Sequence, residues 1–185
     1  MGFEKVSTRI HDAFLLHPKV HKDSRGFFLE SWSKQSFEDI GLSLDFLQDN
    51  HSRSSRGVLR GLHYQSGDTA QGKLVSVSSG IVFDVFVDLR KSSPTYGLWD
   101  GIFLTTENHE RLWVPPGCAH GFLVVSEFAD FHYKVTTPYN KNEERSLIWN
   151  DPILNIEWPL EGMEEVLVSS KDAVAASFID CEKYE

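Results

Sequence analysis

Three side chains near the middle of the chain have types and spacing suited to proton transfer on a charged substrate. Arg60, His63 and Lys73 place a permanent cation, a group that titrates near neutral pH and a flexible ammonium within fourteen residues of one another. Arginine and lysine hold anions, and an imidazole accepts or donates protons at neutral pH. This stretch, VLRGLHYQSGDTAQGK, therefore predicts a site that binds an anionic substrate while moving a proton.

Whether these side chains can meet depends on the backbone between them. In a regular strand, Arg60 and Leu62 would share one face and His63 would lie on the other. Gly61 can break this alternation, because a glycine within a strand often marks a bulge that redirects a side chain. We therefore expect Arg60 and His63 to reach one cavity. The alternative is that His63 is a half-buried strand histidine with a structural hydrogen bond.

A histidine that acts as a general base needs a carboxylate partner to fix its tautomer. Asp84 and Asp88, in the strand-like run 81–90, and Asp172, in the tail, are the candidates. Tyr133 lies in another strand-like run, and its phenol could deliver a proton across a cavity from the histidine. Its alternative is a core aromatic with a satisfied hydroxyl.

A second motif bears on metal binding. Pro115-x-Gly117-x-x-His120 resembles the second metal motif of the cupin jelly rolls, whose first motif has the form HxH with a following Glu. Here the corresponding strand reads His-Tyr-Gln from His63, so one of the three imidazoles is missing. We expect no catalytic metal, which leaves the histidines free to act as bases or hydrogen-bond donors.

The elements that must position these residues are mostly strands. From residue 42 to residue 137, eight short runs rich in β-branched or aromatic residues are separated by Gly, Pro, Ser or Asn, which predicts a sandwich or barrel. Two earlier strands are expected in 12–17 and 26–32, a two-turn helix between Ser33 and Gly41, and a terminal helix over 170–177.

Composition limits the class of protein. A chain of 185 residues with 12% aromatic side chains is expected to be one folded domain. Its net charge of −9 argues against a nucleic-acid surface. No apolar run approaches twenty residues and no signal pattern is found, so a soluble, cytoplasmic protein with no membrane partner is expected. Cys118 and Cys181 lack metal spacing and are read as reduced thiols.

Several stretches together resemble the dTDP-4-dehydrorhamnose 3,5-epimerase family of nucleotide-sugar epimerases, which are cupin-type jelly rolls without metal. The resemblance covers roughly residues 10–175, and the run RGLHYQ followed by QGKLV is highly specific. The matching stretches are DSRGFFLE (23–30), QDNHSRS (48–54), GVLRGLHYQ (57–65), AQGKLV (70–75), FDVFVDLRKSSPTYG (83–97), WVPPGCAHGF (113–122), YKVT (133–136), WNDP (149–152) and SSKD (169–172).

The resemblance assigns roles to residues that match the family's motifs. It implies that His63 is the base, partnered by Asp172, that Tyr133 is the acid on the opposite face of the sugar, and that Lys73 lies by the ketone oxygen. The implied ligands of the sugar nucleotide are Arg25, Glu30, Gln48, Asn50, Arg60, His120, Glu144 and Lys171. No redox or metal cofactor is then required.

The family also implies an architecture and a reaction. We expect one all-β epimerase domain over 1–185, with a jelly-roll core at about 45–150, N-terminal strands at 10–32, a C-terminal loop and helix tail at 150–185, and short peripheral helices. The expected reaction inverts C3 and C5 of dTDP-4-dehydro-6-deoxy-D-glucose in dTDP-L-rhamnose biosynthesis. Family dimers exchange N-terminal strands, so a homodimer with a cross-subunit contribution to the site is expected.

Two departures from the family pattern keep alternatives open. Cys118 stands where the family commonly has Phe, and Pro138 precedes Tyr139 where a second Tyr is often seen. Relatives that invert one carbon keep most of these motifs, so a 3- or 5-monoepimerase is the first alternative. A binding module that kept the pocket but lost catalysis is the second, and a metal-dependent cupin is the third.

Overall fold

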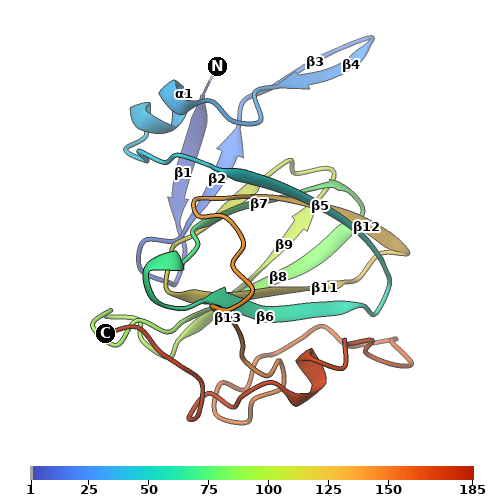
Figure 1. The fold of residues 1–185 in the computed structure, drawn as a ribbon. Helices are drawn as coiled ribbons and strands as arrows, with labels where there is room; N and C mark the ends of the chain where they lie inside the picture. Colours follow the sequence, from blue (N-terminus) through green and yellow to red (C-terminus); the bar gives the residue numbers. More distant parts are fainter. Residues whose placement is uncertain (1) are drawn as a thin grey trace.

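The computed structural model describes residues 2–185, and the chain folds as two antiparallel sheets packed face to face (Figure 1). The all-β, jelly-roll prediction is confirmed. The six-stranded sheet has the order β1 (Phe3–Ser7), β2 (Phe14–Pro18), β10 (Arg111–Val114), β7 (Lys73–Ser79), β12 (Phe128–Val135) and β5 (Gln48–Ser55). The five-stranded sheet has the order β13 (Glu144–Ser146), β6 (Leu59–Gln65), β11 (Cys118–Val124), β8 (Ile81–Asp88) and β9 (Trp99–Thr105).

Two smaller features lie outside these sheets. A hairpin of β3 (Val20–Asp23) and β4 (Gly26–Leu29) projects away from the body in Figure 1. The only α-helix among residues 2–185 is α1 (Lys34–Asp39), and the short 3₁₀ turns are η1 (Gly67–Thr69) and η2 (Asp172–Val174). None of the described helices is long and apolar enough to span a membrane.

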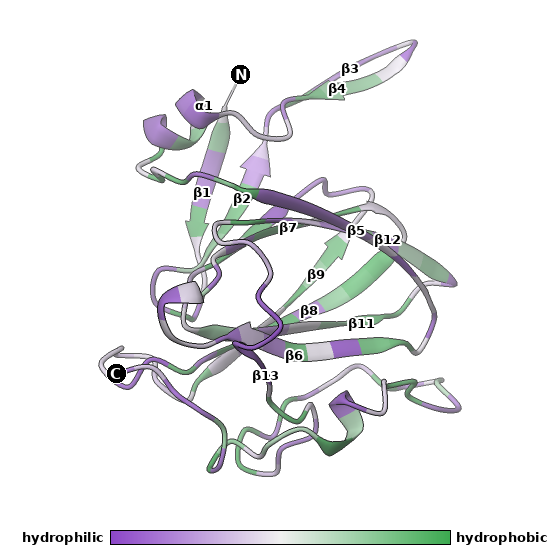
Figure 2. Cartoon of the chain, in the orientation of Figure 1, coloured by the Kyte–Doolittle hydropathy of each residue, from purple (hydrophilic) through white to green (hydrophobic). Residues whose placement is uncertain are grey.

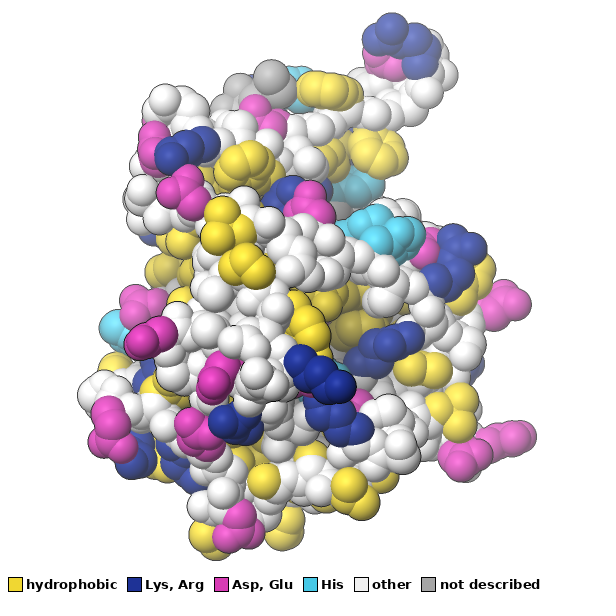
Figure 3. All heavy atoms as spheres, viewed as in Figure 1, with side chains coloured by type: hydrophobic (Ala, Val, Ile, Leu, Met, Phe, Trp, Pro, Cys, Tyr) yellow, Lys and Arg dark blue, Asp and Glu magenta, His cyan; other side chains and the backbone are white. Residues whose placement is uncertain are grey.

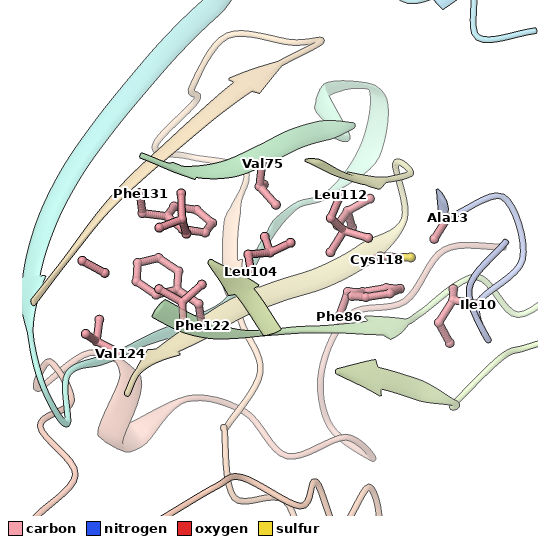
Figure 4. Close-up of a cluster of buried hydrophobic side chains, with 14 residues drawn as sticks. Ile10, Ala13, Val75, Phe86, Leu104, Leu112, Cys118, Phe122, Val124 and Phe131 are labelled. Carbon is pink, nitrogen blue, oxygen red and sulfur yellow. The ribbon is translucent and has the colours of Figure 1, made fainter. Parts of the chain in front are cut away.

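The main core lies between the two sheets (Figure 4). Val75, Leu112 and Phe131 enter it from the six-stranded sheet, and Phe86 and Phe122 enter it from the five-stranded sheet. The rings of Phe122 and Phe131 stack across the interface with centroids 4.0 Å apart. Burial of this apolar surface is the main force that holds the sheets together. In Figure 2 most of the buried strand β8 is hydrophobic, whereas β5 is hydrophilic along much of its length.

Strand β8, whose sequence alternates most regularly, is covered on both faces. Val82 and Phe86 belong to the core between the sheets, and Phe83, Val85 and Val87 to a second cluster. The C-terminal tail completes this second cluster with the side chains of Ile156, Trp158, Phe178 and Tyr184. The tail thus lies against the outside of the five-stranded sheet, and from there it can reach β6.

The helix predicted between Ser33 and Gly41 is confirmed as α1. The hydroxyl of Ser33 accepts a hydrogen bond from the backbone amide of Ser36 at 3.2 Å, which is a helix N-cap. Phe37 is fully buried, and Gly41 has a φ of +78° just after the helix end, a conformation that favours glycine.

Two sequence predictions are wrong in detail. The helix expected over 170–177 is only the turn η2, because Ala175 is extended and Ala176 pairs with Leu147 in an isolated parallel bridge. The strand expected from Leu42 begins at Gln48, because Leu42 is buried in a cluster around α1 instead of pairing with a neighbouring strand.

Candidate active site

A cavity of about 310 Å³ lies between the two sheets, and both sheets supply polar side chains to it. Arg60 and His63 reach it from β6, His120 from β11, Lys73 from β7 and Tyr133 from β12. In Figure 3, lysine and arginine side chains gather beside a hollow in the middle of the face shown. The site therefore combines titratable groups from opposite walls with a cationic rim.

The expected irregularity at Gly61 is confirmed. Gly61 has a φ of +121°, and the pairing of β6 with β11 shifts register between His120 and Phe122. A side chain at Gly61 would put its Cβ 2.6 Å from the Cα of Gly121, so only glycine fits this close approach. As predicted, Arg60 and His63 line the same cavity.

His63 is oriented by a carboxylate from the tail. Its Nε2 lies 2.7 Å from Oδ1 of Asp172, which η2 presents beside β6. Burial raises the pKa of Asp172, but hydrogen bonds from His63 and Ser169 outweigh burial and the net pKa is lowered. Asp172 is thus ionised at neutral pH and engages Nε2, so Nδ1 is the ring nitrogen left for proton transfer. Asp84 and Asp88, the other candidates for this role, bind His120 and Arg90 instead.

Tyr133 faces the same cavity from the other sheet. Burial is the main cause that raises the pKa of its phenol, and the positive charge of Arg60 opposes this only in part. The phenol is therefore protonated at neutral pH and can donate a proton. Within residues 2–185 its hydroxyl has no hydrogen-bond partner, so the proton is available to a bound substrate.

Lys73 supplies a positive charge at the buried end of the cavity. The residue is 6% exposed, and its Nζ donates a hydrogen bond to the backbone carbonyl of His63 at 3.0 Å. Burial lowers the pKa of Lys73 to about 8, so the ammonium form predominates at neutral pH. An ammonium with little water around it stabilises a nearby oxyanion more strongly than it would in bulk water.

A groove of about 310 Å³ adjoins the cavity and shares Arg60, His63 and Glu144 with it. Lys171 also lines this groove, and its Nζ lies 2.6 Å from Oε2 of Glu144. Arg60 uses its Nε to bind the hydroxyl of Ser54 at 3.0 Å, so the rest of its guanidinium is available to other acceptors. Two cations at one rim can hold a di-anionic group such as a diphosphate.

No group of three or more possible metal ligands is found among residues 2–185. His63 and His120 lie opposite each other in the strand register, yet each uses its Nε2 on a different carboxylate. This donor set does not form the three-histidine site of the metal-binding cupins.

Three of the expected ligands line neither the cavity nor the adjoining groove. Arg25 lies at the turn of the projecting hairpin, where it binds Asp23, and Glu30 follows that hairpin and accepts a hydrogen bond from Ser33. Gln48 lies at the start of β5, where its side chain donates a hydrogen bond to Asn50 at 2.8 Å and accepts one from the backbone amide of Tyr139 at 3.0 Å.

Gln71 and Tyr139 are among the lining residues to which sequence reasoning gave no role in the site. Gln71 lies two positions before Lys73, and this strand-like spacing could have identified it. Tyr139 lines the cavity from a loop and donates its hydroxyl to Glu144 at 3.0 Å. A loop residue has no periodic signal, so only the structure identifies its position.

Comparisons with known proteins agree along nearly the whole chain. A family model described as dTDP-4-dehydrorhamnose 3,5-epimerase matches residues 7–180. The dTDP-4-dehydrorhamnose 3,5-epimerase of Salmonella typhimurium strain LT2 is 52% identical over 171 residues, which cover 92% of each chain.

Solved structures agree as well. The dTDP-4-dehydrorhamnose 3,5-epimerase of Elizabethkingia anophelis NUHP1 superposes with a TM-score of 0.92 and 45% identity, covering 97% of this chain and 98% of that one. The dTDP-6-deoxy-D-glucose-3,5-epimerase of Legionella pneumophila Philadelphia 1, solved in complex with dTDP-4-keto-L-rhamnose, superposes with a TM-score of 0.91 and 47% identity, covering 99% of each chain.

Proposed function

This chain belongs to the dTDP-4-dehydrorhamnose 3,5-epimerase family, and we propose that it inverts C3 and C5 of dTDP-4-dehydro-6-deoxy-D-glucose to give dTDP-4-dehydro-L-rhamnose. The observation that carries the proposal is that His63 and Tyr133 line one cavity from opposite sheets. Inversion at a carbon requires that a proton leaves one face of the sugar ring and returns to the other. Two proton-transfer groups on opposite walls meet that requirement.

The first step removes a proton next to the ketone. His63 takes the proton from C5 or C3, and the electron pair of the broken C–H bond moves to the C4 oxygen as an enolate forms. The ammonium of Lys73 meets this developing charge. Removal of a comparable oxyanion donor costs about 2.7–4 kcal/mol in other enzymes, so this contact is a large part of catalysis.

The second step returns a proton to the far face. Tyr133 donates its phenolic proton to the carbon, the enolate reverts to the ketone, and the configuration at that carbon is inverted. The imidazolium of His63 loses its proton and the phenolate of Tyr133 regains one through solvent. No redox or metal cofactor enters this sequence.

The rest of the site binds the sugar nucleotide. Arg60 and Lys171 are suited to the diphosphate because both are cations at the rim. Asn50, His120 and Glu144 offer hydrogen bonds to the sugar from the lining, and Gln48 supports Asn50.

The positions of Arg25 and Glu30 support a homodimer. Both lie on or next to the β3–β4 hairpin, which projects from its own subunit in Figure 1. Phe27 and Phe28 on this hairpin are 58% and 61% exposed, an arrangement typical of an arm that packs against another chain. We propose that the hairpin of one subunit brings Arg25 and Glu30 to the cavity of the other. The organisation as a single domain, the cytoplasmic location and the lack of a nucleic-acid partner remain predictions from the sequence.

Proton NMR in deuterated water tests the function directly. Incubation with dTDP-4-dehydro-6-deoxy-D-glucose is expected to give the L-rhamno product with deuterium at both C3 and C5. His63→Ala is expected to abolish turnover and to bind dTDP normally. Exchange and inversion at one carbon would instead identify a monoepimerase, and binding without turnover by the wild type would identify a binding module. Loss of turnover on treatment with a chelator would indicate a metal-dependent enzyme.

A further inference from the structure

A buried carboxylate behind the cavity has no role in the steps described above. Asp84 lies near the middle of β8 and is 0% exposed. Val82 and Phe86, which share its face of the strand, belong to the apolar core between the sheets. A carboxylate in such surroundings is costly unless it is paired, and even a paired charge is often no more stabilising than an apolar pair of the same size. Stability alone therefore does not explain this residue.

Asp84 holds the cavity residue His120. Both carboxylate oxygens lie within hydrogen-bond distance of His120 Nε2, at 2.8 Å and 3.1 Å. One ring nitrogen facing two carboxylate oxygens is the geometry of an N–H donor, which places the proton on Nε2. Within residues 2–185, Nδ1 of His120 has no hydrogen-bond partner. The carboxylate thus determines which nitrogen of His120 is left for the substrate.

Asp84 also acts on Lys73. No carboxylate lies within 4 Å of Lys73 Nζ among the described residues, so the ammonium has no direct ion pair. Lys73 lines the same cavity as His120, the residue that Asp84 holds. Of the two carboxylates whose charge opposes the effect of burial on the pKa of Lys73, Asp84 contributes more than Glu144 on β13. Asp84 is therefore the main counter-charge of this cation.

The remaining titratable groups near this cluster are the two cavity histidines. Burial is the main cause that lowers the pKa of His120, and the charges of Lys73 and of His63 on β6 act in the same direction. Burial raises the pKa of Asp84, and His120 and Lys73 oppose that effect. The three side chains of Lys73, Asp84 and His120 therefore form one buried, mutually dependent charge group at the closed end of the cavity.

We propose that Asp84 is a positioning residue of the reaction, which fixes His120 with its Nε2–H directed at the carboxylate and keeps Lys73 in the ammonium form. The inference rests on the proposed function, in which Lys73 meets the enolate oxygen. Asp84 does not touch the substrate and acts through these two neighbours.

The variant Asp84→Asn separates charge from hydrogen bonding, because an amide oxygen can still accept from His120 Nε2. Loss of the negative charge lowers the pKa of Lys73. Activity requires the ammonium form of Lys73 and is lost as pH rises through its pKa. The alkaline limb of the pH profile of kcat is therefore expected to move to lower pH by about one unit. At pH 8, near the wild-type pKa of Lys73, kcat is then about fivefold below that of the wild type, whereas the affinity for dTDP is unchanged.

Asp88→Asn is the matched control. Asp88 is also 0% exposed on β8, but its carboxylate binds Arg90, Ser93 and Thr95. This variant is expected to lower the melting temperature without moving the alkaline limb. If Asp84→Asn behaves in the same way, Asp84 is only structural and the inference is overturned. A wild type without turnover would overturn the proposed function instead.

A second measurement does not depend on turnover. Long-range ¹H–¹⁵N NMR spectra of the wild-type protein report the tautomer of each imidazole, with the signals of His120 assigned by comparison with His120→Gln. Neutral His120 is expected to carry its proton on Nε2. A proton on Nδ1, with a protonated Asp84 donating to Nε2, would contradict the inference.

Discussion

The carboxylate of Asp172 is more deeply buried than the imidazole it orients. The side chain of Asp172 is 4% exposed and that of His63 is 34% exposed. His63 can therefore exchange protons with a substrate and with solvent, while its tautomer is set from behind. Such an arrangement suits a base that must reset after every turnover.

Asp172→Asn tests this arrangement. The amide can still contact Nε2, but it no longer stabilises the imidazolium that forms when His63 takes the proton. We expect kcat to fall about 10²-fold or more, with little change in dTDP affinity. Steady-state kinetics and calorimetric titration with dTDP measure the two quantities. Asp180→Asn, an exposed change in the same tail, is the control and is expected to keep full activity.

The pairing of His63 with Asp172 could not be predicted from the pattern of residues in the strands. The types and spacing of Arg60, His63 and Lys73 predicted a proton-transfer site. The carboxylate that binds His63, however, lies 109 residues further along the chain. From the residues alone Asp84, Asp88 and Asp172 were equal candidates, and only the resemblance to a family favoured Asp172. Contacts between distant segments depend on how the tail packs, which no local pattern encodes.

At the scale of elements, the close approach of β6 and β11 at Gly61 and Gly121 positions the two histidines of the cavity. Gly61→Ala would place a methyl group 2.6 Å from the Cα of Gly121 and 2.8 Å from the carbonyl oxygen of His120. We expect a loss of about 3 kcal/mol in unfolding free energy, from backbone strain and overpacking together, and a lower kcat because both strands shift. Thermal unfolding and kinetics measure these effects.

Gly67→Ala is the matched control for that variant. Gly67 also has a positive φ, of +58°, but nothing lies within 4 Å of a Cβ placed there. Only the backbone strain remains, so a loss of about 1 kcal/mol with normal kcat is expected. Equal losses in the two variants would show that the close approach of the two strands is unimportant.

The elements themselves were largely predictable. Alternating side chains identified β8, and Ser33 and Gly41 identified the ends of α1. The wrong predictions arose where tertiary contacts override local preference. Residues 170–177 have the composition of a helix, but Ala176 pairs with the segment after β13 instead. Leu42 reads as part of a strand, but it fills the core beneath α1.

At the scale of the whole molecule, the proposed homodimer predicts complementation. The Arg25→Ala homodimer is expected to be weakly active, and the His63→Ala homodimer is expected to be inactive. A hybrid dimer of the two contains one site with an intact hairpin and an intact His63. Unfolding and refolding an equal mixture should therefore restore about a quarter of wild-type activity, because half of the dimers are hybrids with one working site each. No recovery would mean that each chain uses its own hairpin.

In the proposed reaction, each of the two sheets supplies one proton-transfer group to its own face of the sugar ring. The most direct test is to incubate the Tyr133→Phe variant with dTDP-4-dehydro-6-deoxy-D-glucose in deuterated water and to follow the sugar by proton NMR. Tyr139→Phe, from the same cavity, is the control. Tyr133→Phe is expected to exchange the proton that His63 removes for deuterium but to form no inverted product, whereas Tyr139→Phe is expected to invert normally. Inversion at the wild-type rate by Tyr133→Phe would contradict the account.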